Sequence, residues 1–302
     1  AKDWPAQAVR IVLPYPPGGA SDVTARLLGH QLGLALNASV IVENRPGANG
    51  IIANELVAKS AADGYTVLMA NLGPNAINPA VYARLPYDTA KDFAPVILTT
   101  KVPLLIVAAV DSPLTSLEQF IALAREKPGQ VSFGSAGNGS GSHLAGELLA
   151  MTTGTKMLHL PYKGDAPALT DLMSNQVTVA LPTALAGVPH VKSGKLRALA
   201  VTSQSRIPSL PDVPTVDEAL GTSGFEAVSW GGLMVPAGTS APIVPRINTE
   251  TNRALQMPDI RTKLSAQGAE VMGGTPEAFG TFLRSELSKW KRVAEAAKVR
   301  LE

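Results

Sequence analysis

The chain has 302 residues, a formal net charge of +2 and 17% charged residues, fewer than the roughly 25% of an ordinary soluble domain. This length suits two domains of usual size, and the absence of a dense Lys/Arg stripe excludes a nucleic-acid footprint. No cysteine is present, which excludes thiol catalysis, disulfides and cysteine-based zinc sites.

Short apolar or β-branched runs alternate with helical patterns along the chain. The runs predict strands over residues 9–15, 39–44, 65–71, 104–110, 131–135, 177–182, 196–202 and 227–236. This rhythm is typical of βα units and mostly parallel sheets. The first helix follows residue 20, with Ser21 as the expected N-cap and a buried face that contains Ala25, Leu28, Leu32, Ala35 and Leu36.

The first Gly-rich loop, "PYPPGGASD", joins the first strand to the first helix. The first N–H groups of a helix lack partners and carry partial positive charge, so they bind anions readily. The candidate donors are the amides of Gly18, Gly19, Ala20 and Ser21. Asp22 would repel an anion unless it accepts a hydrogen bond from water, a hydroxyl or a ligand ammonium; its alternative role is to stabilise the helix start.

A second unit of strand, Gly-rich loop and helix occurs at "VSFGSAGNGSGSHLAGELLAM". Its candidate donors are the amides of Ala136–Gly141, among them that of Asn138, and the hydroxyls of Ser135, Ser140 and Ser142. Leu144, Leu148 and Met151 are expected on the buried face of the helix. Two such loops, in different halves of the chain, favour two anion-binding sites, one in each of two lobes. The alternative is that their prolines and glycines only form tight strand-to-helix turns.

The order of the elements suggests a discontinuous first lobe. Residues 1–100 plus 226–302 form the expected lobe 1, and residues 101–225 form lobe 2, with crossings near residues 100 and 226. Near the C-terminus, Thr275 is the expected cap of a long docking helix, with Pro276 at its first position.

Enzyme and metal motifs are missing from both loops. Neither loop matches a phosphate-binding P-loop, a dinucleotide fingerprint or a nucleophile elbow, and the four histidines form no metal pair. We therefore expect no catalytic residue, no metal and no cofactor. A hydrolase that uses Ser140 with His143, and a nucleotide-binding domain, are the alternatives from the residues alone.

Several stretches resemble one known family. "RIVLPYPPGGASDVTARLLG", "VIVENRPGANGIIANELVAKSAADGYTVLMAN", "FGSAGNGSGSHLAGELL", "HLPYKG", "PHVKSGKLRALAVT" and "GGTPEAFGTFLRSE" are together similar to the Bug proteins, periplasmic solute receptors of tripartite tricarboxylate transporters. The resemblance implies an α/β fold of the two-lobe periplasmic-binding-protein type (Venus flytrap, type II-like). Each lobe has a mixed β-sheet flanked by helices, with the ligand cleft between the lobes.

The family binds small organic acids. The resemblance implies that one ligand carboxylate lies between the two Gly-rich loops, partly held through ordered water. The other end faces variable positions around Asn71–Asn75, Tyr162, Lys163 and Thr183. The expected ligand-binding residues are Tyr15, Pro17, Gly18, Gly19, Ala20, Ser21, Asp22, Asn71, Asn75, Ser135, Ala136, Gly137, Asn138, Gly139, Ser140, Tyr162, Lys163 and Thr183.

This chain departs from the family pattern at the distal positions. Thr183 stands where many relatives have Asp, which favours a plain or aromatic diacid over an aspartate- or glutamate-type amino acid. Tyr162 is expected either to stack on an aromatic ligand or to pack at its strand end. Lys163 either meets a distal carboxylate or remains solvated.

The resemblance also implies a cellular role. It predicts a monomer in the periplasm, exported with a signal peptide that is then removed, which delivers a carboxylate to membrane permease subunits and binds no nucleic acid. A sensor that hands its closed form to a signalling protein is the alternative with the same fold.

Overall fold

The computed structural model describes residues 3–302, and the chain divides into two compact units. The first unit holds the chain up to Lys101 together with Trp230–Lys291 and Arg300–Glu302; the second holds Val102–Ser229 and Arg292–Val299. The chain therefore passes from one unit to the other after residues 101, 229, 291 and 299.

A mixed sheet forms the centre of the first unit. Within the described residues its strands have the order β11-β4-β10-β3-β1-β2. Their bounds are Val9–Leu13 (β1), Val40–Asn44 (β2), Thr66–Asn71 (β3), Phe93–Pro103 (β4), Val228–Pro236 (β10) and Glu270–Val271 (β11). β1 runs parallel to β2 and β3, whereas β10 is antiparallel to β3 and β11 to β4.

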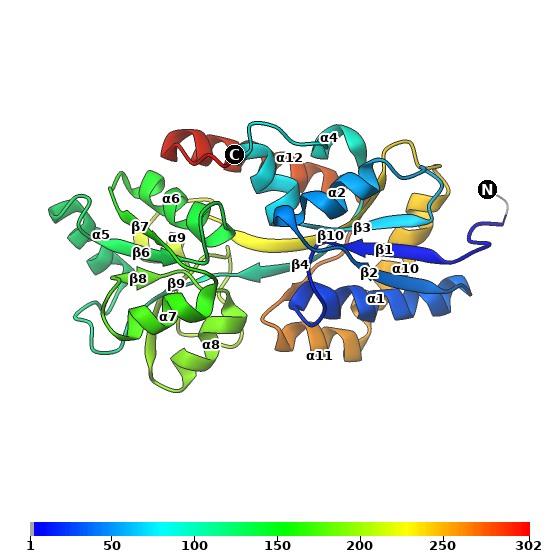
Figure 1. The fold of residues 1–302 in the computed structure, drawn as a ribbon. Coiled ribbons are helices and arrows are strands. Elements are labelled where there is room, and N and C mark those ends of the chain that lie inside the picture. Colours follow the sequence, from blue (N-terminus) through cyan, green and yellow to red (C-terminus); the bar gives the residue numbers. More distant parts are fainter. Residues whose placement is uncertain (1–2) are drawn as a thin grey trace. The chain divides into compact units, whose positions relative to one another are not determined.

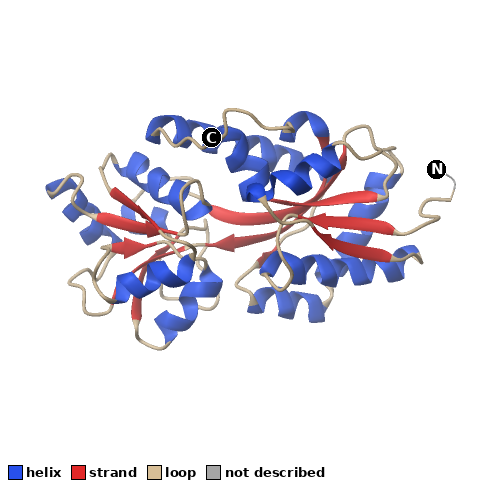
Figure 2. Ribbon diagram, in the orientation of Figure 1, coloured by secondary structure: helices blue, strands red, loops and turns tan. Residues whose placement is uncertain are grey.

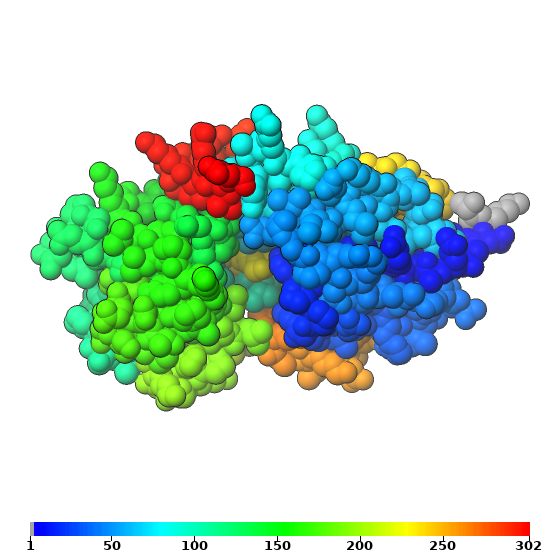
Figure 3. Space-filling view, viewed as in Figure 1, coloured from blue at the N-terminus to red at the C-terminus, as the bar shows by residue number. Residues whose placement is uncertain are grey.

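Helices cover both faces of this sheet. They are α1 (Ala20–Leu36), α2 (Ile51–Ala58), α3 (Asn78–Val81), α4 (Thr89–Asp92), α10 (Ile243–Gln256), α11 (Pro258–Ala266) and α12 (Pro276–Ala297), with short turns at Ala48–Gly50 and Gly73–Ile77. Figure 1 shows α1 and α11 below the strands and α2 and α12 above them. In the space-filling view (Figure 3) the visible surface of this unit is mostly its N-terminal hundred residues, blue to cyan.

Apolar periodicity explains the packing of α1. Ala25, Leu28, Leu32 and Leu36 are buried in one core with residues of β1 and β3, as the sequence predicts. Ala35 was expected on the same face but is exposed; it lies in the last turn of α1, one residue before the helix ends at Leu36.

The second unit has a five-stranded mixed sheet in the order β7-β6-β8-β5-β9. The strands are β5 (Leu105–Ala109), β6 (Ser132–Ser135), β7 (Leu158–Pro161), β8 (Val179–Ala180) and β9 (Leu196–Val201). β6 runs parallel to β7 and β8, whereas β5 is antiparallel to β8 and β9. Its helices are α5 (Leu117–Glu126), α6 (Gly141–Thr153), α7 (Asp165–Met173), α8 (Ala184–Lys192) and α9 (Val216–Leu220). Figure 2 shows strands and helices interleaved in this unit, with the connecting loops in tan.

Of the two predicted helix caps one is confirmed and one is wrong, and a further cap was not predicted. Ser140 caps α6 by accepting the His143 N–H, and Thr275 accepts the Ala278 N–H at the start of α12, which confirms that cap. Ser21 is not a cap: α1 begins at Ala20, with Gly19 before it. The Ser21 hydroxyl instead donates to Asn71, so a tertiary partner takes the group that capping would use.

Candidate functional site

The loops that follow the parallel strands of the first unit meet at one edge of its sheet. β1, β2 and β3 all point the same way, and ligands of α/β proteins bind outside the carboxyl ends of such strands. Asn44, at the end of β2, donates to the Tyr15 carbonyl at 3.0 Å. Ser21 donates to Oδ1 of Asn71, at the end of β3, at 2.9 Å. The fold thus brings Pro17–Asp22 and Asn71 together.

Some backbone N–H groups of this first loop already have a hydrogen-bond partner, and others remain open to a ligand. Gly18 has φ of 100°, and its N–H donates to Asp22 Oδ2 at 3.0 Å. No residue in the described part of the chain accepts the N–H groups of Ala20, Ser21 or Asp22. The open donors are therefore those of the first helical turn, while the Gly18 amide is engaged.

Asp22 organises this loop. The residue is 4% exposed, and its carboxylate accepts hydrogen bonds from Gly18, from Arg26 at 3.1 Å and from Asn44 at 2.9 Å. Burial alone would raise the pKa of this carboxyl, but the bonds from Asn44, Arg26 and Gly18 outweigh burial and lower it. The ion pair with Arg26 offsets the negative charge beside the open amides.

The two asparagines expected near the ligand have different settings. Asn75 is fully buried; it accepts the Asn71 N–H at 3.0 Å and donates to Asn54 at 2.8 Å. Asn71 is 7% exposed, and its side chain contacts Ser21 and the Met69 carbonyl. In this arrangement Asn75 supports Asn71, and Asn71 orients the Ser21 hydroxyl.

Tyr15 lies beside the same edge. A Cβ atom added to Gly73 would lie 3.6 Å from its hydroxyl, so the phenol faces the turn that follows β3. Burial raises the pKa of Tyr15 to about 12, which keeps the hydroxyl protonated and able to donate at neutral pH.

The second unit repeats this layout. The loops after β6, β7 and β8 lie at one edge because these strands are parallel. Tyr162 N–H donates to the Ser135 carbonyl at 3.0 Å, and Gly164 N–H donates to the Ala136 carbonyl at 3.1 Å. The predicted positions 135–140 and 162–163 are thus neighbours.

Most amides of the second Gly-rich loop have partners inside the loop. The acceptors are Ser142 Oγ for Ala136, Ser135 Oγ for Gly137, His143 Nδ1 for Gly139 and the Gly137 carbonyl for Ser140. Among residues 3–302 no acceptor is found for the N–H groups of Asn138, Gly141 and Ser142. Asn138 is exposed and the other two begin α6, so the open donors again lie at a helix start.

Ser140 and His143 are not arranged as a nucleophile and base. The Ser140 hydroxyl accepts the backbone N–H of His143 at 3.2 Å. The ring of His143 accepts the Gly139 N–H through Nδ1 and places Nε2 3.4 Å from Glu147. Both ring nitrogens therefore have partners other than Ser140.

A stacked pair of histidines, His143 and His159, packs against the second Gly-rich loop. The rings of His143 and His159 lie 3.6 Å apart and nearly parallel, and His159 Nε2 lies 2.6 Å from Ser135 Oγ. Burial, together with His143, lowers the pKa of His159 to about 4. His159 is thus neutral at physiological pH, which suits a packed support for Ser135.

Tyr162 and Lys163 follow β7. The Tyr162 ring lies against Gly134, where an added Cβ would come within 3.3 Å, and its hydroxyl donates to Asp171 at 2.8 Å. Burial and the bond to Asp171 raise the pKa of Tyr162 to about 12. Lys163 is exposed. These contacts are those of a packed strand-end tyrosine.

Thr183 caps α8 and binds a carboxylate from another loop. Its Oγ1 accepts the Ala186 N–H at 3.3 Å, and its N–H and Oγ1 both donate to Asp165 Oδ2 at 3.1 Å. Burial raises the pKa of Asp165, and the two bonds from Thr183 oppose that rise. Asp165 was not among the predicted site residues.

Residues 3–302 contain no group of three or more His, Asp or Glu side chains placed to hold a metal ion. None of their helices has the length and apolar character that crossing a membrane requires.

Comparison with known proteins places the chain in a family. Residues 24–299 match the model of the tripartite tricarboxylate transporter family receptor. Protein BugT of Bordetella pertussis is 37% identical over 303 residues, covering 100% of this chain and 93% of BugT. The chain belongs to this receptor family.

Solved structures of two similar proteins agree with this assignment. The R. palustris protein Rpa4515, solved with adipate, has 37% identity and a TM-score of 0.81 over 98% of this chain and 99% of its own. MatC of Rhodopseudomonas palustris, solved with bound malate, has 33% identity and a TM-score of 0.77 over 96% and 99%. The resemblance to the Bug receptors and the periplasmic-binding-protein fold class are confirmed, and the family is one of solute receptors, not of enzymes.

Several residues of this receptor that position predicted site residues were not themselves predicted from the sequence. Asn44, Arg26 and Asn54 hold Asp22 and Asn75, while Asp165 binds Thr183. Asn44 ends a predicted strand and Asp165 begins a helix after a glycine. Their positions in the sequence therefore gave only a weak signal of a role in the site. Whether the predicted residues of the receptor contact ligand remains a prediction.

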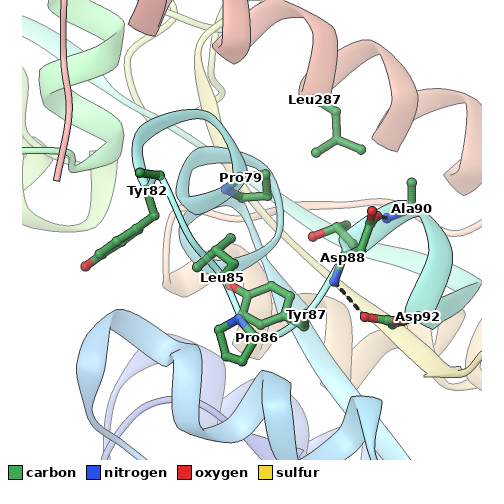
Figure 4. Close-up of a pocket in the computed structure, with 11 residues that line it drawn as sticks. Pro79, Tyr82, Leu85, Pro86, Tyr87, Asp88, Ala90, Asp92 and Leu287 are labelled. Atoms are coloured by element: carbon green, nitrogen blue, oxygen red, sulfur yellow. Dashed lines mark hydrogen bonds between the residues drawn. The ribbon is translucent and has the colours of Figure 1, made fainter. Parts of the chain in front are cut away.

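A separate cavity of about 510 Å³ lies in the first unit of the receptor. Figure 4 shows Tyr82, Leu85, Tyr87 and Asp88 on the segment before β4, with Leu287 of α12 above them. None of the predicted ligand-binding residues lines this cavity.

Proposed function

We propose that this receptor binds a small organic acid through the open N–H groups at the starts of α1 and α6. The observation that carries the proposal is the same arrangement in both units: unpartnered N–H groups of a first helical turn, at the carboxyl edge of parallel strands. Anions are favoured there by the N–H groups and by the helix dipole.

The ligand class rests on the chemistry of these donors and on the relatives. Open N–H groups suit a carboxylate, which accepts several hydrogen bonds at once, and Arg26, the cation at the first loop, is already paired with Asp22. The titles of the similar structures name adipate and malate, both dicarboxylates. We extend this class to the present chain, with one acid in contact with both Gly-rich loops in a cleft between the two lobes.

The place in the cell follows from the family. We propose that the receptor works in the periplasm as a monomer, after removal of a signal peptide, and delivers the acid to the permease subunits of a tripartite tricarboxylate transporter. Deletion of the gene should reduce uptake of the bound acid by cells, and the wild-type gene should restore it. Uptake unchanged by the deletion would argue against delivery.

A thermal-unfolding panel tests the ligand class. Aliphatic, hydroxylated, amino and aromatic carboxylates are compared with inorganic phosphate and nucleotides at equal concentration. A ligand at 100 times its dissociation constant should add about 2.7 kcal/mol to the free energy of unfolding. Stabilisation by phosphate-bearing compounds in place of carboxylates would contradict the proposal.

A further inference from the structure

Asp165 presents a carboxylate oxygen without a partner at the edge of the second unit. Both bonds from Thr183 reach Oδ2. No donor within residues 3–302 reaches Oδ1, and none of the ion pairs in the described chain involves Asp165. One oxygen therefore remains available to accept a hydrogen bond.

This oxygen lies on the same edge as the open amides of the second Gly-rich loop. Gly164, the residue before Asp165, has φ of 104°, and its N–H donates to the Ala136 carbonyl at 3.1 Å. Thr183 follows β8, which is parallel to β6. The loops that carry Ala136, Asp165 and Thr183 are thus joined by hydrogen bonds at the carboxyl ends of adjacent strands.

The surroundings of Asp165 differ from those of Asp22. Asp22 has Arg26, Asn44 and Gly18 around its two oxygens, whereas among residues 3–302 only Thr183 donates to Asp165. Asp165 is partly buried, and burial raises its pKa. A partly desolvated carboxylate with one unsatisfied oxygen gains most from a donor, above all a cationic one.

We propose that Asp165 is a specificity-determining residue that accepts a hydrogen bond from an ammonium or hydroxyl group of the bound acid. The receptor would then prefer acids that carry such a donor over plain dicarboxylates of the same length. This inference rests on the proposed function. It also replaces the preference for plain diacids suggested by Thr183, because the fold brings a carboxylate to Thr183 from residue 165.

The test is calorimetric titration of the wild type and Asp165→Asn with matched acids. Succinate, malate and aspartate differ only in the donor at one carbon, and adipate and 2-aminoadipate repeat the comparison at greater length. The wild type should bind the donor-bearing acids about tenfold to a hundredfold more tightly than the plain acid, as expected for a hydrogen bond to a charged group. Asp165→Asn should lose that ratio and bind the plain acid as well or better, because a like charge is removed.

Asp111→Asn is the matched control. It removes one negative charge from the same unit, at an exposed residue that pairs with Asn175. Asp111 follows β5, which runs antiparallel to β8, so it lies at the opposite edge of the sheet. The control should keep the wild-type ratio. If Asp165→Asn fails to unfold cooperatively, Asp165→Ser removes the same charge and serves for the same comparison.

The outcomes separate this inference from the function on which it rests. Carboxylate binding with no preference for donor-bearing acids, or a preference unchanged in Asp165→Asn, overturns the role of Asp165 and leaves the proposed function standing. Absence of binding for every carboxylate tried overturns both.

Discussion

Asp22 and Asp165 both lie beside open N–H groups, yet their neighbours hold them in different electrostatic states. Three donors stabilise the ionised form of Asp22 and lower its pKa against the effect of burial. At Asp165 burial outweighs the two bonds from Thr183 and raises the pKa. The same residue type therefore serves as a loop support in one unit and as a candidate ligand contact in the other.

His159 should make the stability of the receptor depend on pH. Its pKa is about 4 in the folded chain and about 6.5 when unfolded. Between these values the unfolded state binds more protons, so the free energy of unfolding should decrease as pH falls from about 6.5 to about 4. His159→Gln should flatten this decrease, measured by denaturant unfolding at a series of pH values.

The control for this experiment is His30→Gln, which alters an exposed histidine of α1. Equal flattening in both variants, or a slope unchanged in His159→Gln, would show that His159 is not the titrating group. Glu147, which lies 3.4 Å from the ring of His143, and His143 itself face the same cluster.

At the scale of elements, the start of α1 offers two glycines with different constraints. Gly18 has φ of 100°, whereas Gly19 has φ of −78°, and a Cβ at either position would meet no atom within 4 Å. A side chain at Gly19 is thus tolerated by the backbone, and it would adjoin Ala20, the first residue of α1 with an open amide. A side chain at Gly18 adds backbone strain.

Gly19→Val should abolish carboxylate binding with little loss of stability, because the added side chain blocks the approach of an anion. Gly18→Val should also weaken binding and cost about 1 to 3 kcal/mol of stability from its positive φ. Gly129→Val, at an exposed glycine with φ of 74° and open surroundings, controls for the strain alone. Titration and thermal unfolding measure both effects; wild-type affinity in Gly19→Val would remove α1 from the site.

Apolar periodicity predicted the buried face of α1 better than that of α6. α1 buries four of the five residues that its pattern indicates. In α6, Leu144 is buried as predicted, but Met151 is 45% exposed and Leu149 is buried in its place. The helix is short and apolar on several sides, so its neighbours in the fold decide which face is covered.

At the scale of the whole molecule, the proposed ligand would link two separately folded units. Charge-assisted hydrogen bonds strengthen when water is excluded, so an acid held by both Gly-rich loops should select a closed form. Solution X-ray scattering should show a smaller radius of gyration with a saturating carboxylate than without it. Gly19→Val should show no change with the same acid, and an unchanged radius in the wild type would contradict closure.

Many elements of the fold could be predicted from the sequence, but not all of the strands. Strand and helix alternation, both Gly-rich loops and the family were evident from the sequence. β4 and β11 are not among the predicted strands. The run at residues 102–110 is divided between β4 and β5, because Pro103 ends one strand and Leu105 begins the next.

The sequence by itself determined that two helices begin at Gly-rich loops after strands, since periodicity and turn residues act over a few neighbours. Only the tertiary structure decided which amides remain open and which side chains support them. Ser21 and Asn71 are 50 positions apart, and Asp165 and Thr183 are 18 apart. Such partners meet because parallel strands bring their carboxyl ends to one edge, a consequence of sheet order that no local pattern contains.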